Sequence, residues 1–201
     1  MPDPLDEFIS LEVKYPIWER FLYAAPLVLI GTADSDGTPN LAPKHRVIPL
    51  GWDNYVGFAC CPSHSTYQNA GREGFFTVNY PRPEQVVLAS LAAAPQCEEG
   101  TREAMEALDT VPATRGNAFL LQDAYVYLEC ELDRIVDGFG SCSLVSGRVV
   151  AAMVHRDSRL STERDPQDVI LEYPILAYVS PQRVTKIRHT HKFPHPPRRG
   201  R

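Results

Sequence analysis

Short apolar runs separated by turn sequences dominate residues 26–81. The first run, Pro26-Leu-Val-Leu-Ile-Gly-Thr32, leads into Asp34-Ser-Asp-Gly37, and the Asp-Gly pair supplies the positive-φ residues of a tight turn. The chain returns through Asn40-Leu-Ala42 until Pro43, which has no amide hydrogen to donate, interrupts it. This pattern predicts a β-hairpin at the start of an antiparallel sheet.

Further strand patterns follow in hairpin order along the rest of the chain. Strands are predicted at 54–60, 75–79, 125–133, 141–155, 175–179 and 184–187, and a short helix near 66–71 ends at Gly71 or Gly74. Gly147 interrupts the long run at 141–155, which suits the corner of a small barrel. These strands with a few helices predict a mainly β fold, a closed antiparallel barrel rather than a Rossmann sheet.

Three further helices are predicted outside the strand segments. Val13, Ile17, Phe21 and Ala24 share one helical face, so a helix is expected to start near Pro16. Residues 85–93 are rich in Ala and Leu and predict a second helix. Within the loop-like stretch 94–117, a short helix is expected from Thr101 through Leu108.

Bulk properties narrow the class of protein. A chain of 201 residues predicts one domain, over 1–190, followed by a basic, proline-rich tail at 191–201. A formal net charge of −5 argues against a dedicated nucleic-acid binder. No apolar run reaches the roughly 18 residues of a membrane span. The acidic start lacks an apolar signal core, so a cytoplasmic location without membrane association is expected.

The cysteines and histidines point to neither a disulfide framework nor a metal site. Five cysteines without a Cys-x-x-Cys pair are expected to be reduced thiols, and the adjacent Cys60 and Cys61 point to opposite faces of a strand. His189, His191 and His195 lie in the proline-broken tail without a cysteine or carboxylate cluster, so no built metal site is expected. No nucleophile elbow, P-loop or dinucleotide-binding glycine motif is present in the sequence.

A hydroxyl-rich loop precedes the helix predicted near 66–71. Ser63, Ser65 and Thr66 offer hydroxyl donors, and Ser65-Thr-Tyr-Gln68 fits a capping box with Ser65 as N-cap. First-turn amides of a helix are unpaired and carry partial positive charge, which favours a phosphate dianion. His64 and Arg72 could add charge-assisted bonds. Ordinary helix capping is the alternative interpretation.

The order of strand, turn, strand, hydroxyl-rich loop, short helix and strand, with Asn69 and the run Gly74-Phe-Phe-Thr-Val-Asn79, resembles the flavin reductase-like, FMN-binding split-barrel family. The resemblance implies a Greek-key split barrel that forms a homodimer and binds FMN, with FAD the less favoured flavin. It implies that the hydroxyl-rich loop grips the flavin phosphate. The cofactor-binding residues it implies are Asn40, Leu41, Ala42, Pro43, Lys44, Ser63, Ser65, Thr66, Asn69 and Asn79.

The segment after the first hairpin matches the part of that family that lies against the flavin ring. Ala42 would let the backbone approach the ring, and the Lys44 cation near N1–C2=O would stabilise the negative charge of reduced flavin. Here the sequence departs from the family, because Pro43-Lys-His-Arg46 replaces a Ser- or Thr-rich run and Pro43 removes an amide donor. A solvated cationic edge that discourages strand pairing is the alternative for this cluster.

The resemblance implies an oxidoreductase that passes electrons from NAD(P)H to flavin or a small acceptor. NAD(P)H-using members commonly carry a Gly-Asp-His element followed by a tyrosine. This chain has His155-Arg156-Asp157 in the corresponding place, with Tyr173 and Tyr178 beyond it. No catalytic residue is assigned. A non-catalytic flavin-binding or electron-carrier protein is the alternative, and a split barrel for FAD, a deazaflavin or haem is a third hypothesis.

Overall fold

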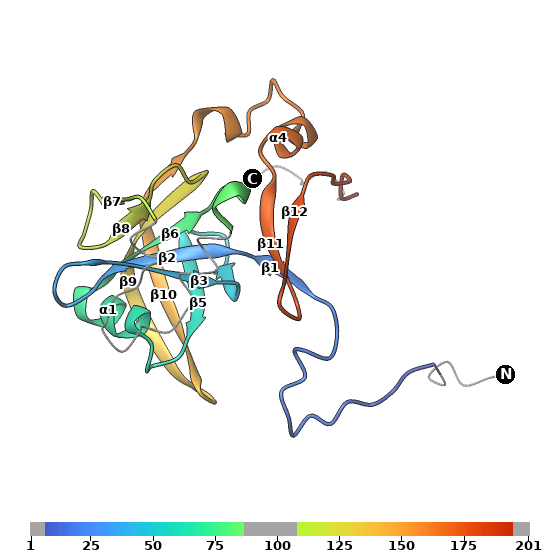
Figure 1. Cartoon of the computed structure of the whole chain (residues 1–201), viewed down its shortest axis with the longest axis horizontal. Coiled ribbons are helices and arrows are strands. Elements are labelled where there is room, and N and C mark those ends of the chain that lie inside the picture. Colours follow the sequence, from blue (N-terminus) through green and yellow to red (C-terminus); the bar gives the residue numbers. More distant parts are fainter. Residues whose placement is uncertain (1–6, 87–107, 195–201) are drawn as a thin grey trace.

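The computed structural model describes residues 7–86 and 108–194, and strands dominate it (Figure 1). The predicted helices over 85–93 and 101–108 lie almost entirely outside the described residues, as does the tail from residue 195 onward. Within the described part, no helix is long and apolar enough to cross a membrane.

Seven strands form one antiparallel sheet in the order β3-β2-β6-β9-β10-β5-β4. Their bounds are β2 Val28–Ala33, β3 Pro39–Lys44, β4 Val47–Pro49, β5 Tyr55–Cys60, β6 Phe75–Tyr80, β9 Val126–Phe139 and β10 Cys142–Val154. Strands β3 and β4 lie at opposite edges of the sheet, yet only two residues separate them in the chain. The sheet therefore curls back on itself. The Ala59 amide donates to the Arg46 carbonyl oxygen at 3.0 Å across this junction. The expected mainly β, antiparallel barrel is confirmed, although no ladder joins β3 to β4 within residues 7–86.

Two smaller sheets and two helices complete the described part. Strand β11 (Ile175–Val179) lies between β1 (Ala24–Pro26) and β12 (Arg183–Ile187), and β7 (Thr110–Pro112) pairs with β8 (Phe119–Leu121). Helix α1 (Ser65–Glu73) lies beside the barrel on the side away from α4 (Pro166–Glu172) (Figure 1). Single turns of 3-10 helix, η1 and η2, occur at Pro83–Gln85 and Arg156–Ser158.

Strand β2 is buried on both of its faces, which explains its continuous apolar sequence. Val28 and Ile30 belong to the barrel core around Phe58 and Phe76, whose rings meet edge to face with centroids 5.2 Å apart. Leu29 points the other way, into a second cluster with Leu41, Leu108, Leu121 and Ala124. Alternate residues of a strand face opposite sides, so one run of apolar residues supplies both cores.

Gly147 lies at an irregularity between β9 and β10, as its place in the sequence predicted. The register between these strands shifts between Ser146 and Gly147. A Cβ atom at Gly147 would lie 2.6 Å from the Phe76 ring and 2.9 Å from the Glu131 carbonyl oxygen. The Phe76 ring therefore packs where any side chain at position 147 would have to be.

The helix predicted from Pro16 is wrong. Residues 11–23 contain turns and bends, and regular structure begins with β1 at Ala24. Short isolated helices are marginal unless a packed apolar face supports them. Here the described residues bury little of that face, since Val13 is 83% and Phe21 41% exposed. The N-terminal arm, residues 7–23, extends away from the barrel (Figure 1).

Helix α4 was not predicted, although its start carries a clear signal. The Asp165 carboxylate accepts a hydrogen bond from the Gln167 amide at 2.8 Å, and Pro166 occupies the first turn. An N-cap aspartate followed by proline is typical of a helix start. Val169 is the buried residue of this short helix.

Candidate functional site

Helix α1 begins directly after β5, through the turn formed by residues 61–64. The His64 amide donates to the Cys61 carbonyl oxygen at 3.0 Å, and the His64 carbonyl then accepts from Tyr67 and Gln68. The N-cap is therefore His64, with Ser65 in the first helical position. The predicted capping box is wrong, because the turn at Cys61–His64 starts the helix one residue earlier. The Gln68 side chain instead donates to the Pro62 carbonyl oxygen at 3.4 Å.

The hydroxyls predicted to hold phosphate gather at this helix start. Ser63 is exposed, Ser65 is half-buried and Thr66 is buried at 2% exposure. Within residues 7–86 and 108–194, none of the three hydroxyls donates a hydrogen bond to the protein. Helix α1 has nine residues, so its first amides also present unpaired donors with partial positive charge. The turn therefore offers several donors suited to an anion.

Lys44, at the end of β3, lies at the same place. Burial raises the pKa of the Cys60 thiol, and the neighbouring Lys44 ammonium partly offsets that rise. Burial, and then the charge of Lys44, lowers the pKa of His64, whose Nδ1 lies 3.9 Å from the Cys60 sulfur. The curl of the sheet thus brings a cation from the predicted ring-binding segment to the predicted phosphate loop.

The other residues of the predicted ring-binding segment lie along β3, an edge strand. Among the described strands, β3 pairs with β2 only, so part of its backbone is not used by a ladder there. Ala42 and Pro43 are half-buried, whereas Leu41 is fully buried in the second core cluster. Leu41 can therefore contribute only its backbone to a ligand.

Asn40 and Asn69 are brought together by one carboxylate. The Asn40 amide donates to Asp34 Oδ1 at 3.0 Å, and Asn69 donates to the same oxygen at 2.7 Å. Asn69 also donates to the Thr32 hydroxyl at 3.1 Å. The Asn40 Oδ1 atom is buried and has no hydrogen-bond partner among the described residues. Asn69 is thus a link between α1 and the β2–β3 turn, while Asn40 retains an unused acceptor.

Arg72 faces this same network rather than the helix start. Its guanidinium donates to Asn69 Oδ1 at 2.9 Å, to the Ala33 carbonyl at 2.6 Å and to Glu73 at 2.6 Å. The suggestion that Arg72 adds charge at the phosphate loop is therefore wrong. Arg72 lies seven positions after Ser65, about two turns from the free amides, and it bonds to the end of β2 instead.

Asn79, also predicted as a binding residue, is fully buried on β6. Its amide donates to the Leu29 carbonyl at 3.0 Å and the Thr77 hydroxyl at 2.9 Å, and its Oδ1 accepts from the Leu121 amide at 2.9 Å. These bonds join β6 to β2 and β8. Because the Asn79 donors and acceptor are already used inside the protein, its side chain is not available to a ligand in this structure.

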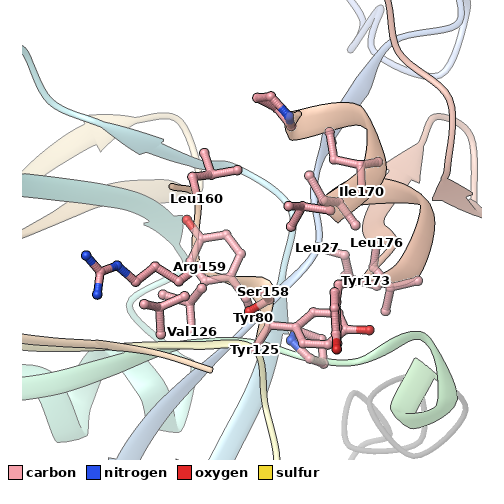
Figure 2. Close-up of a pocket in the computed structure, with 15 residues that line it drawn as sticks. Leu27, Tyr80, Tyr125, Val126, Ser158, Arg159, Leu160, Ile170, Tyr173 and Leu176 are labelled. Atoms are coloured by element: carbon pink, nitrogen blue, oxygen red, sulfur yellow. The ribbon is translucent and has the colours of Figure 1, made fainter. Parts of the chain in front are cut away.

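A separate cavity of about 420 Å³ lies between the barrel and α4 (Figure 2). None of the predicted binding residues lines it. Its lining is mainly apolar and aromatic, and includes Leu27, Tyr80, Tyr125, Val126, Leu160, Val169, Tyr173 and Leu176. The sequence patterns did not reveal it, because its residues come from strands and turns far apart in the chain.

His155 lies near this cavity rather than near the α1 turn. Its ring lies 6.1 Å from that of Tyr173, which lines the cavity, and its Nδ1 is buried without a partner in the described part of the chain. Tyr178, the other tyrosine considered with His155, stacks on His45 at 4.0 Å. Among the described residues, no group of three or more His, Cys, Asp or Glu side chains is arranged to hold a metal ion.

The chain resembles known proteins over most of its length. A family model described as the flavin reductase like domain matches residues 20–178. Among solved structures, flavoredoxin from Methanosarcina acetivorans has a TM-score of 0.77 and 18% identity, covering 94% of this chain and 95% of its own. Nitrilotriacetate monooxygenase component B from Bacillus cereus has a TM-score of 0.78 and 15% identity, covering 94% and 100%.

A third match is 2-nitrobenzoate 2-nitroreductase from Pseudomonas fluorescens, with a TM-score of 0.72 and 21% identity over 86% of this chain and 85% of that protein. At these identities the structural matches show a shared fold. The family model covers far more than half of the sequence. This chain therefore belongs to the flavin reductase-like family.

Proposed function

We propose that the protein is an FMN-dependent oxidoreductase that passes electrons from NAD(P)H to flavin or a small acceptor. The observation that carries this proposal is the group of hydroxyls at the start of α1 that have no hydrogen-bond partner among the described residues, close to the Lys44 ammonium. Such a group suits the terminal phosphate of FMN. Similar proteins named as a nitroreductase and a monooxygenase component support an oxidoreductase role.

The phosphate is assigned to the turn before α1. Ser63, Ser65 and Thr66 would donate from their hydroxyls, and the first amides of α1 would donate from the backbone. Lys44 would supply the full positive charge, which makes the bonds to phosphate charge-assisted. Asn69 would contribute indirectly, because its hydrogen bonds to Asp34 and Thr32 hold helix α1 in position.

The flavin ring and ribityl chain are assigned to the outer side of β3. The edge strand offers backbone groups not used by a ladder, and the buried, unpartnered Asn40 Oδ1 suits a ribityl hydroxyl or ring N–H donor. The half-buried Ala42 and Pro43 leave room for a flat ring beside the backbone. Asn79 is not part of this assignment, because its amide is used inside the protein.

Bound FMN would supply two-electron redox chemistry, accepting hydride from NAD(P)H and passing electrons onward. The protein's own contribution is to hold the phosphate and to position the ring. The charge of Lys44, beside the phosphate turn, would also favour the negatively charged reduced flavin at longer range. This reaction needs no protein acid or base at the reacting atom, and none is assigned.

The proposed working form is a cytoplasmic homodimer. The N-terminal arm extends from the barrel and exposes large apolar side chains, with Ile9, Val13, Trp18 and Leu22 all at least half exposed. Monomeric proteins rarely leave so many apolar residues together in water. In the proposed dimer, a second copy of the chain would cover these apolar side chains.

A flavin carrier without NAD(P)H activity is the second candidate. The observation that favours it is the place of His155, which lies near the apolar cavity at α4 and away from the α1 turn. The Gly-Asp-His element is also missing from the sequence.

Anaerobic reduction separates the two candidates. The FMN-loaded protein is mixed with NADH or NADPH, and the flavin absorbance is followed. The oxidoreductase proposal predicts bleaching at a rate that saturates with one of the nucleotides. Bleaching by dithionite but by neither nucleotide would establish the carrier instead. Protein that binds no FMN would overturn both.

A further inference from the structure

Cys61 and Cys142 lie with their sulfur atoms 3.2 Å apart, although 81 positions separate them in the sequence. Strands β5 and β10 pair antiparallel, with Ser143 opposite Cys60, so the next pair outward is Cys142 and Cys61. Side chains directly opposite one another in an antiparallel pair point to the same face. Residues opposed in this way generally have Cα atoms about 4.5–5.5 Å apart, which is within the range that a disulfide spans.

These two thiols differ from the other described cysteines. Cys61 and Cys142 are half-buried, whereas Cys60 and Cys130 are buried. Burial raises the pKa of Cys130 to about 12, and the hydrogen bond with Cys142 raises the pKa of Cys61, so exposure rather than acidity distinguishes the two pairs. Cys60 points to the opposite face of β5 from Cys61, toward His64. Among the described cysteines, Cys61 and Cys142 are therefore the two that a small thiol reagent can reach.

We propose that Cys61 and Cys142 form a reversible disulfide, made and broken by exchange with small-molecule thiols and disulfides. In the forward direction, the thiolate of one cysteine attacks a glutathione disulfide, which forms a mixed disulfide and releases one glutathione thiolate. The second cysteine then attacks the mixed disulfide and releases the other glutathione. Two thiol protons and two electrons leave the protein, and one disulfide becomes two thiols.

The new bond would act on the turn before α1. Cys61 begins that turn, and its carbonyl oxygen accepts the His64 amide at 3.0 Å. A disulfide would fix this turn to the first residue of β10, and so would hold the hydroxyls of Ser63 and Ser65 in a narrower set of positions. The resulting change in FMN affinity rests on the proposed function, whereas disulfide formation does not.

Mass spectrometry of the full chain tests the disulfide. The protein is incubated with oxidised glutathione, thiols are alkylated, and trypsin releases the peptides 47–72 and 135–148, which carry Cys61 and Cys142. The proposal predicts one linked pair of these peptides, lighter by two hydrogens, which dithiothreitol separates. Because Cys60 shares the first peptide, Cys60→Ser is the matched control and must retain the link. Cys61→Ser and Cys142→Ser must lose it.

Several results would overturn the inference. These are the absence of the linked peptides, single glutathione adducts that never resolve, or a link between two chains on a non-reducing gel. The oxidised protein should also unfold at a midpoint at least about 5 °C higher than the reduced protein, since the bond closes a long loop.

Binding measurements separate this inference from the proposed function. If the disulfide forms and FMN affinity is unchanged, only the proposed effect of the disulfide on the turn before α1 is refuted. Absence of FMN binding in both redox forms would remove the proposed function and leave the disulfide standing.

Discussion

Asn69 Nδ2 donates to Asp34 Oδ1 at 2.7 Å and thereby joins helix α1 to the turn between β2 and β3. The same carboxylate oxygen accepts from Asn40 at 3.0 Å, so the edge strand and the helix share one anchor. The start of α1 and the edge strand β3 are therefore held in a fixed relation, and both belong to the proposed flavin site.

Replacement of Asn69 tests this anchor. Asn69→Ala leaves the half-buried Asp34 carboxylate and the buried Thr32 hydroxyl with fewer partners, so the free energy of unfolding should fall by about 1–3 kcal/mol. FMN affinity should also fall, because α1 is less well positioned. Urea unfolding and FMN titration measure the two effects. The exposed neighbour Gln68→Ala is the control, and equal stability of the two variants would contradict the role of Asn69.

Gly147 and Gly71 make a matched pair of glycine substitutions. Gly147→Ala places a methyl group 2.6 Å from the Phe76 ring, whereas a Cβ at Gly71 meets only Ile135, at 3.7 Å. Gly147→Ala should therefore lower the free energy of unfolding by about 1–3 kcal/mol through overpacking. Gly71→Ala should raise it by about 0.5–1 kcal/mol, because alanine is the better helix residue. Thermal unfolding of both variants measures these changes. A Gly147→Ala protein as stable as the parent would refute the packing argument.

His45 should make stability depend on pH. Burial, then the charges of Arg46 and Lys44, lowers the pKa of His45 below its usual value of 6.5. The unfolded chain then binds a proton more readily than the folded one, so stability falls as the pH drops through about 6.5 toward the lowered value. His45→Gln should lose less stability between pH 7.5 and 5.5 than the parent protein. The exposed His191→Gln should behave like the parent, and an unchanged slope in His45→Gln would contradict the prediction.

Lys44 is expected to influence the flavin through its charge. Lys44→Gln should weaken FMN binding and lower the reduction potential of the bound flavin by about 30 mV, since 30 mV in a two-electron couple is about 1.4 kcal/mol. Spectroelectrochemical titration gives the potential. Arg46→Gln, which changes an exposed cation two residues away, is the control. An unchanged reduction potential in Lys44→Gln would show that the Lys44 charge does not act on the flavin ring.

Much of the fold follows from local pattern. The run at 26–32 and the Asp36-Gly37 turn predicted the β2–β3 hairpin, because a tight hairpin depends on neighbouring residues alone. Gly147 marked the irregular register in β10, although its cause, the distant Phe76 ring, could not be read from the local sequence. The N-terminal arm shows where local pattern fails. Its helical spacing is real, but the described residues do not bury the apolar face, and Val13 and Phe21 are exposed.

The candidate site was predictable in part for the same reason. The hydroxyls at Ser63–Thr66 could be recognised from the sequence because they precede a helix. The roles of Asn79 and Arg72 could not, because their partners, Leu121 and Ala33, lie 42 and 39 positions away. The meeting of Lys44 with His64 depends on the curl of the sheet, which no local sequence pattern encodes.

Binding of FMN and riboflavin to the protein and to Thr66→Ala tests the central claim most directly. Riboflavin lacks the phosphate, so it reports on the ring site alone. The proposed function predicts that Thr66→Ala weakens FMN binding by about 1–3 kcal/mol, or about 5- to 150-fold, and leaves riboflavin binding unchanged. Fluorescence titration measures both. Equal FMN affinity in the parent and in Thr66→Ala would contradict the assignment of the phosphate to the start of α1.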